Sequence, residues 1–189
     1  MKNGGADALS VLTDAHYFQG HRDYLTAVKQ TVDLPVLRKD FIISNVQVEE
    51  SKRIGADALL LIVDTVPIEQ LKELYDMAYA LGLECLVEVH SEAELEQLLA
   101  AFTPKIIGIN NRNLKTFETS LTQTEAMSAY IPEGSLFVSE SGIHSRADLD
   151  RVKRAGAAAV LVGESLMRAK SPQVGIEQLF GGEPLATSS

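Results

Sequence analysis

The chain has 189 residues, 46% of them hydrophobic, and a formal net charge of -9 at pH 7. This length allows one domain or most of a larger one, and the acidic balance argues against nucleic acid and anionic membranes as partners. Cys85 is the single cysteine, which excludes an intrachain disulfide and favours a cytoplasmic protein. The longest apolar runs are about eight residues, far below the roughly 20 that cross a bilayer.

Seven short apolar runs predict β-strands. They cover residues 8–13, 35–41, 58–65, 84–90, 105–110, 136–141 and 159–164. Most are continuous rather than alternating, which is typical of strands covered on both faces. Helix-like stretches lie between them, and the start and stop signals are clearest over 67–82, 91–102 and 145–156. This order of strands and helices predicts a parallel sheet with helices outside.

A repeat marks the junctions between helices and strands. The segment GADALSVLTD at 5–14 returns as GADALLLIVD at 55–64 and, more loosely, as GAAAVLVGES at 156–165. In each copy a Gly-Ala pair leads from a helix end into a buried strand. The first copy lies so near Met1 that no helix fits before it, which indicates a missing unit.

Two α/β architectures compete for this pattern. A doubly wound open sheet would carry a Gly-rich turn after its first strand, but residues 13–24 read TDAHYFQGHRDY. A complete barrel of eight βα units takes about 250 residues, and this chain is about 60 residues and one strand short. We therefore predict a (β/α)8 TIM barrel that lacks its first βα unit, with strands 2–8 in residues 1–180 and a flexible tail at 181–189.

Polar residues stand at the carboxyl ends of three predicted strands, where continuous apolar character is expected. They are Arg38, Lys39 and Asp40, then Glu88 and His90, then Ser139, Glu140 and Ser141. Any single one is equally well explained as a strand end that emerges into solvent, but their recurrence on one rim favours an active site. Lys39 and Glu88 form the sharpest candidate acid and base, although the spacing does not show which face either occupies.

Small residues follow the last two strands, in SESG and VGES. Backbone N–H groups at this place in a barrel commonly bind phosphate, and the alternative is an ordinary tight turn. Asn110 and Arg112 end another strand and are suited to orient a carboxylate or a sugar hydroxyl. No metal site is predicted, because the four histidines are scattered without ligand spacing. Cys85 lies early in its strand and is assigned to the core.

Residues 4–179 resemble the indole-3-glycerol phosphate synthase family of tryptophan biosynthesis. The similar segments are ALSVLTDAHYFQG, LPVLRKDFI, GADALLLIV, LVEVH, IGINNRNLKTF, VSESGI and AVLVGESLM. The resemblance implies a carboxy-lyase that closes the ring of 1-(2-carboxyphenylamino)-1-deoxyribulose 5-phosphate with loss of carbon dioxide and water. It implies neither a metal nor an organic cofactor.

The resemblance also implies roles for individual residues. Lys39 corresponds to the general acid and Glu88 to the general base of the dehydration. Asn110 and Ser141 match positions that are catalytic or orient the substrate, and Glu140 and Arg112 would line the same pocket. The resemblance further assigns phosphate binding to the backbone around Ser141, Gly142, Gly163 and Glu164. It assigns contact with the anthranilate ring to Phe41 and Leu86.

The chain departs from the family pattern in several places. The family's N-terminal extension and a first strand with a Glu-x-Lys pair have no counterpart, so we expect impaired activity and self-association through unpaired barrel edges. Glu164 stands where a serine is common, and Asp64 stands at a usually apolar rim position. The alternatives are a non-catalytic barrel fragment that needs the missing segment or strand exchange, and another phosphate-handling barrel related to phosphoribosylanthranilate isomerase or thiazole synthase.

Overall fold

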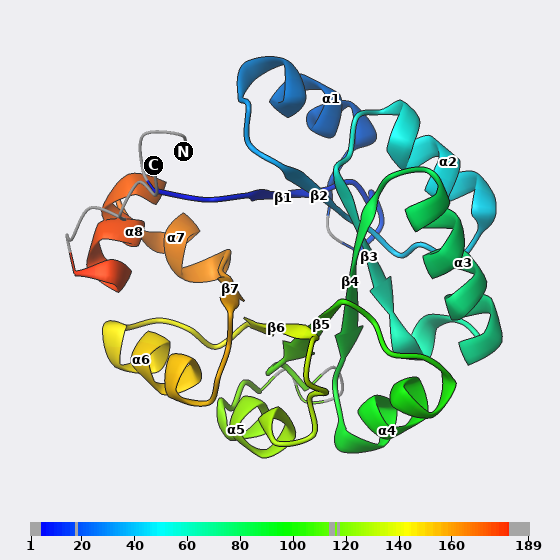
Figure 1. Cartoon of the computed structure of the whole chain (residues 1–189). Helices are drawn as coiled ribbons and strands as arrows, with labels where there is room; N and C mark the ends of the chain where they lie inside the picture. The colour runs from blue at the N-terminus through cyan, green and yellow to red at the C-terminus, as the bar shows by residue number, and fades with distance from the viewer. Residues whose placement is uncertain (1–4, 18, 114–115, 117, 182–189) are drawn as a thin grey trace.

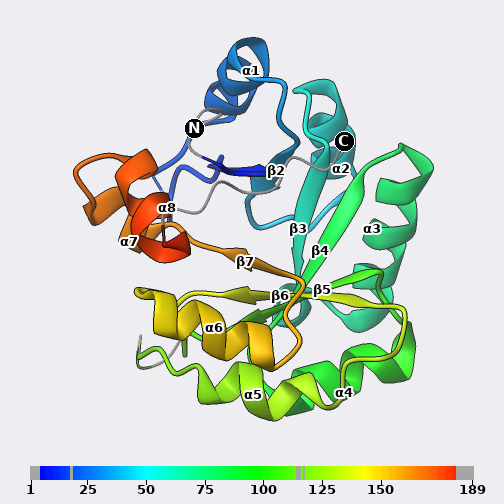
Figure 2. The same ribbon diagram turned by 60° about the vertical axis from the view of Figure 1, so that its left-hand side comes forward.

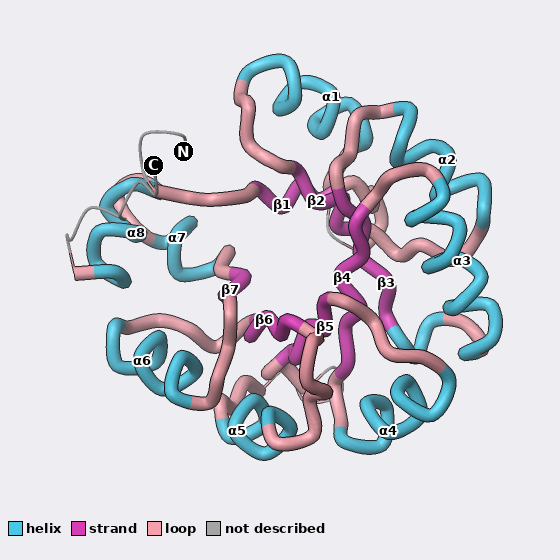
Figure 3. The backbone as a smooth tube through the Cα atoms, in the orientation of Figure 1, coloured by secondary structure: helices cyan, strands magenta, loops and turns pink. Residues whose placement is uncertain are grey.

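The computed structural model describes residues 5–17, 19–113, 116 and 118–181. Seven parallel strands form one sheet in chain order. The strands are β1 (Leu9–Leu12), β2 (Val36–Lys39), β3 (Ala58–Ile62), β4 (Glu84–Val89), β5 (Ile106–Asn110), β6 (Leu136–Glu140) and β7 (Ala159–Leu161). Figure 1 shows the sheet curled around a central axis with the helices outside it, and Figure 3 separates the inner strands from the outer helices by colour. The predicted TIM-barrel architecture without one unit is confirmed.

The helices follow the strands around the outside of the curl. They are α1 (Arg22–Thr31), α2 (Asn45–Arg53), α3 (Ile68–Ala80), α4 (Glu92–Ala101), α5 (Thr122–Ser128), α6 (Arg146–Arg154), α7 (Glu164–Arg168) and α8 (Pro172–Phe180), with a 3-10 turn η2 at Val63–Thr65. The last strand ends three residues earlier than predicted, so Glu164 begins α7 instead of ending the strand. Residues 182–189 of the predicted tail lie outside the described residues.

The glycines of the repeat have a common conformation. Gly5, Gly55 and Gly156 have φ angles of 84°, 93° and 97°. This left-handed region favours glycine and is the usual way in which a helix ends before the chain turns into the next element. Gly55 follows α2 before β3, and Gly156 follows α6 before β7. The repeat therefore encodes one type of helix-to-strand turn.

The strands bury two different faces. Cys85, Val87 and Val89 of β4 belong to a large core that includes residues of the surrounding helices, as predicted for Cys85. Leu86 belongs to a smaller apolar cluster to which β2–β7 contribute and no helix does. Since side chains alternate along a strand, this smaller cluster marks the concave inner face of the sheet.

The sheet ends at β1 and β7. Within the described residues, each of these strands pairs with a single neighbour, β2 or β6. Figures 1 and 2 place α7 and α8 on the side of the molecule where the two end strands lie. No helix of the described part of the chain is both long and apolar enough to cross a membrane.

Candidate functional site

Four polar side chains meet at the carboxyl end of the concave face. Lys39, Glu88 and Glu140 each lie two residues beyond a member of the inner apolar cluster, so strand alternation directs them to the same face. The Nζ of Lys39 lies 3.4 Å from Oε2 of Glu88 and 3.8 Å from Oε2 of Glu140. Asn110 ends β5 and donates from Nδ2 to Oε1 of Glu88 at 3.0 Å. The structure thus brings the predicted acid and base together.

Glu140 is the most deeply buried acid of this cluster, with 1% of its surface exposed. Burial and the negative charge of Glu88 raise the pKa of Glu140 well above its usual value. Burial also acts to raise the pKa of Glu88, but His90, the charge of Lys39 and the amide of Asn110 outweigh it and hold that pKa below its usual range. The opposite directions of these pKa shifts mean that a proton shared by the two carboxyl groups is favoured on Glu140.

Among the described residues no N–H group or hydroxyl donates to either carboxyl oxygen of Glu140, so its hydrogen-bonding neighbour is the carboxyl group of Glu88. A buried polar group without a partner is costly, and such groups are concentrated where a ligand completes the bonding. The cluster thus brings two carboxyl groups with oppositely shifted pKa values together with Lys39, beside the inner apolar cluster. Phe41 and Leu86, which were predicted to contact an aromatic ring, both belong to the inner apolar cluster beside it.

The turn after β6 has a strained backbone and is anchored by a buried asparagine side chain. Ser141 and Gly142 have φ angles of 65° and 76°, and a left-handed conformation is unusual for serine. The buried amide of Asn111 donates from Nδ2 to the backbone oxygens of Glu140 and Ser141, at 3.0 and 3.1 Å. Its Oδ1 accepts from the hydroxyl of Thr124 at 2.8 Å, which ties the turn to α5. Asn111 was missed in the sequence, although its place beside Asn110 in INNRN was the available signal.

Comparison with known proteins identifies the family. The sequence model described as "Indole-3-glycerol phosphate synthase" matches residues 1–179. The chain belongs to the indole-3-glycerol phosphate synthase family. The protein of that name from Halalkalibacterium halodurans is 69% identical, over 98% of this chain and 72% of the relative. The one from Priestia megaterium is 62% identical, over 95% of this chain and 71% of the relative.

Members of the indole-3-glycerol phosphate synthase family are decarboxylating lyases of tryptophan biosynthesis. Solved structures agree on the fold alone. 3-Hexulose-6-phosphate synthase from Salmonella typhimurium superimposes with a TM-score of 0.72 at 14% identity, over 93% of this chain and 85% of that structure. Outside the family, the shared feature is thus the barrel architecture.

The remaining predicted residues of this indole-3-glycerol phosphate synthase homologue form a second group. Nη2 of Arg112 lies 2.9 Å from Oε2 of Glu164, and Arg168 lies 3.0 Å from the other oxygen. Hydrogen bonds from these two guanidinium groups lower the pKa of Glu164. The backbone N–H of Arg112 also donates to Oδ1 of Asn110 at 3.0 Å, which fixes the amide orientation toward Glu88. Gly163 immediately precedes α7, and a Cβ added there would meet no atom within 4 Å.

No group of three His, Cys, Asp or Glu side chains that could hold a metal ion occurs in the part of the chain that the structure describes. The exposed Asp64 lies in η2, which directly follows β3. The cluster of Lys39, Glu88, Asn110 and Glu140 thus places an amino group, an amide and two carboxyl groups together on the concave face.

We expect Gly108→Ala to displace the carboxyl group of Glu140. A Cβ at Gly108 would lie 2.1 Å from Oε1 of Glu140 and 3.2 Å from Cδ1 of Leu86. Both neighbours are buried, so the free energy of unfolding should fall by about 1–3 kcal/mol, the usual cost of overpacking. Urea unfolding followed by circular dichroism measures it. Gly163→Ala is the matched control, because nothing lies within 4 Å of its added Cβ. Equal stability of the two variants would contradict the prediction.

Proposed function

We propose that this chain catalyses the ring closure of 1-(2-carboxyphenylamino)-1-deoxyribulose 5-phosphate to indole-3-glycerol phosphate, with loss of carbon dioxide and water. The observation that carries the proposal is the contact of Lys39 with the buried carboxyl groups of Glu88 and Glu140 on the concave face. Ring closure and dehydration both need an acid near an oxygen, and dehydration also needs a base. This cluster supplies both. No metal or organic cofactor enters the proposed reaction.

Lys39 acts as the general acid in this proposal. Its ammonium group would donate a proton to the carbonyl oxygen of the ribulose chain as the aromatic carbon attacks the carbonyl carbon. The new carbon–carbon bond closes the ring, and departure of carbon dioxide returns its electron pair to the ring. Because only 16% of the Lys39 side chain is exposed to water, its charge would act strongly on that oxygen.

Glu88 acts as the general base in the dehydration. Its carboxylate would accept the proton lost from the carbon next to the nitrogen, while Lys39, protonated again from solvent, donates the proton with which the hydroxyl group leaves as water. Asn110 holds the carboxylate in place. Glu140, which carries the shared proton, and Ser141 are suited to hydrogen-bond the hydroxyl groups of the substrate. Phe41 and Leu86 would cover the anthranilate ring, since both belong to the apolar wall of the same face.

The phosphate site is assigned to the backbone at the last two strand ends. Ser141 and Gly142 form the turn after β6, and Gly163 and Glu164 lead into α7. Glu164 would contribute its backbone N–H only, because its side chain is engaged by Arg112 and Arg168. Arg112, which pairs with Glu164, would then lie at the edge of the site. It would bind the substrate after releasing Glu164. A cytoplasmic location fits the reaction proposed.

Turnover tests the proposal. Formation of the indole ring is followed by its fluorescence, in single-turnover mode with the 189-residue chain in excess over substrate. We expect a slow but measurable rate, because β1 and β7 each lack a second neighbour within the described sheet. A rate equal to the uncatalysed one would contradict the proposed activity, and a rate typical of complete barrel enzymes would contradict the impairment.

A second candidate function follows from the two end strands of the sheet. The chain would act as a barrel fragment that needs another strand, supplied by the family's first βα unit or by a second copy. Unpaired sheet edges favour such pairing. Adding a peptide of that unit should then raise the melting temperature and the rate, and sedimentation should reveal dimers in its absence. A cooperative monomer that is unaffected by the peptide would exclude this candidate.

A further inference from the structure

His90 directly follows β4, two residues beyond Glu88, so its side chain lies on the same face. Only 8% of the imidazole is exposed. Its Nε2 lies 2.9 Å from Oε1 of Glu88, and its Nδ1 lies 3.5 Å from Oε2 of Glu94. The contact with Glu88 is an ion pair by distance, without the alignment of a hydrogen bond. The imidazole is thus held between two carboxylates, one of them the proposed base.

The start of α4 fixes Glu94 in this position. The carboxylate of Glu94 accepts from the backbone N–H of His90 at 2.7 Å and from the hydroxyl of Ser91 at 3.2 Å. The hydroxyl of Ser91 in turn accepts from the backbone N–H of Glu94 at 3.2 Å. The backbone oxygen of His90 accepts from the side chain of Gln123 in α5, which also donates to the backbone oxygen of Asn110. Hydrogen bonds thus join the backbone of His90 to α4 and α5.

The neighbours of the two buried carboxyl groups differ in a way that decides which one is protonated. Lys39 lies at similar distances from both Glu88 and Glu140, so it distinguishes them weakly. Asn110 contacts Glu88 but is neutral. His90 is the group with a potential positive charge whose ion-pair contact is with Glu88 and not with Glu140. The position of the shared proton thus depends on His90.

We propose that His90 is a positioning residue for the base: as an imidazolium held between Glu88 and Glu94, it keeps Glu88 ionised and places the shared proton on Glu140. This inference deepens the proposed function, on which it rests, by adding a residue to the same site. When the substrate draws Lys39 toward its own oxygen, His90 remains as the counterion of Glu88.

The charges around His90 support its protonated form. Glu88 faces it from β4 and Glu94 from α4, while Lys39 approaches the other oxygen of Glu88 and also contacts Glu140. Burial acts to lower the pKa of His90, but its close contacts with the two glutamates raise it to about 9. A histidine with a raised pKa is charged below that value, so His90 is an imidazolium at neutral pH.

The chain contains a matched control for this residue. The segment HSEAE at 90–94 has a near copy, HSRAD, at 144–148. His144 stands before α6 in the same way, where Asp148 accepts from its backbone N–H at 3.1 Å and Ser145 caps the helix. His144 is exposed, however, and no carboxylate of a strand pairs with it in the part of the chain that the structure describes. His90→Gln and His144→Gln therefore change the same local motif with and without the contact to Glu88.

The first experiment is an NMR titration of the imidazole signals of the intact chain, assigned with the two variants. The signal of His90 should stay at its protonated position through neutral pH and move with a midpoint near pH 9. A midpoint below 7 would overturn the proposal. Glu94→Gln, which keeps His90 itself, should lower that midpoint. The titration does not depend on turnover, so a failure of the proposed function and a failure of this inference remain distinguishable.

The second experiment follows the glutamate carboxyl carbons and the rate. In His90→Gln the titration midpoint of Glu88 should rise by about one pH unit or more, and the acid limb of kcat/KM should move up by the same amount. His144→Gln should change neither. A merely structural role would lower the plateau of kcat/KM and leave its acid limb in place. An unchanged Glu88 midpoint in a folded His90→Gln variant would overturn the proposal.

Discussion

Lys39→Met should lower kcat/KM by about 10²–10⁴-fold, the usual contribution of a general acid. Methionine keeps most of the length of the side chain but removes the proton donor and the positive charge that faces Glu88 and Glu140. KM should change less than kcat, because the ammonium group acts on an oxygen whose charge develops in the transition state. The single-turnover fluorescence assay measures both.

Lys153→Met is the control for this substitution. Lys153 is exposed in the last turn of α6, so the variant has the same change in net charge away from the cluster. Its rate should equal that of the unmodified chain. The Lys39 variant must also be shown to fold, by circular dichroism and urea unfolding, since it removes a counterion from two buried carboxyl groups. A folded Lys39→Met variant within tenfold of the unmodified chain would contradict the role of general acid.

The fold was predictable because its signals are local. Continuous apolar runs mark strands that are covered on both faces, and all seven of them are present in the structure. Gly55 and Gly156 marked two of the helix-to-strand turns, where a left-handed conformation is needed. The strand ends were less accurate, as at β7, because the apolar character continues through Val162 into a segment that leaves the sheet. Pairing to β6, and not composition, ends that strand.

The site was predictable only in part, because the continuous apolar runs that reveal the strands do not reveal their faces. A strand that is apolar on both sides does not show which residues face the helices, so Arg38 and Lys39 looked alike at the rim. In the structure Lys39 faces the inner cluster, whereas Arg38 points outward and contacts Ser51 of α2. Asn111 was missed for a related reason, since its partners Thr124 and Ser139 come from other elements and no local pattern links them.

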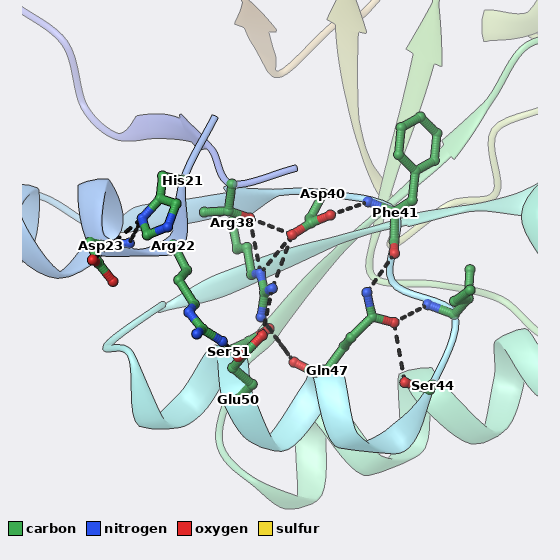
Figure 4. A network of polar contacts seen from close by, with 12 residues as sticks. His21, Arg22, Asp23, Arg38, Asp40, Phe41, Ser44, Gln47, Glu50 and Ser51 are labelled. Carbon is green, nitrogen blue, oxygen red and sulfur yellow. Dashed lines mark hydrogen bonds and ion pairs between the residues drawn. The ribbon is translucent and has the colours of Figure 1, made fainter. Parts of the chain in front are cut away.

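Arg38→Met should produce the largest loss of stability, about 3–5 kcal/mol, which is typical of removing one partner from a buried ion pair. Figure 4 shows the guanidinium group between the strand end and α2. It lies 3.0 Å from Asp40 and 2.8 Å from Glu50, and it donates to the hydroxyl of Thr13 at 3.0 Å. Asp40 would keep its bonds from Thr13 and Phe41 but lose its buried counterion. Urea unfolding at neutral pH measures the loss.

Arg22→Met is the control that distinguishes the loss of a buried ion pair from the loss of an exposed one. Arg22 binds the same carboxylate, Glu50, at 2.9 Å but has 61% of its side chain exposed. This variant should lose at most about 1 kcal/mol, as exposed ion pairs do.

Adding Asp40→Asn and Glu50→Gln to Arg38→Met should restore part of the stability, since no buried charge is then left without a partner. Asp40 also contacts the next residue, Phe41: the backbone N–H of Phe41 donates to Oδ1 of Asp40 at 2.8 Å. A loss in Arg38→Met no larger than that in Arg22→Met would mean that this network does not anchor the β2 end, and that the position of Lys39 is set by the sheet alone.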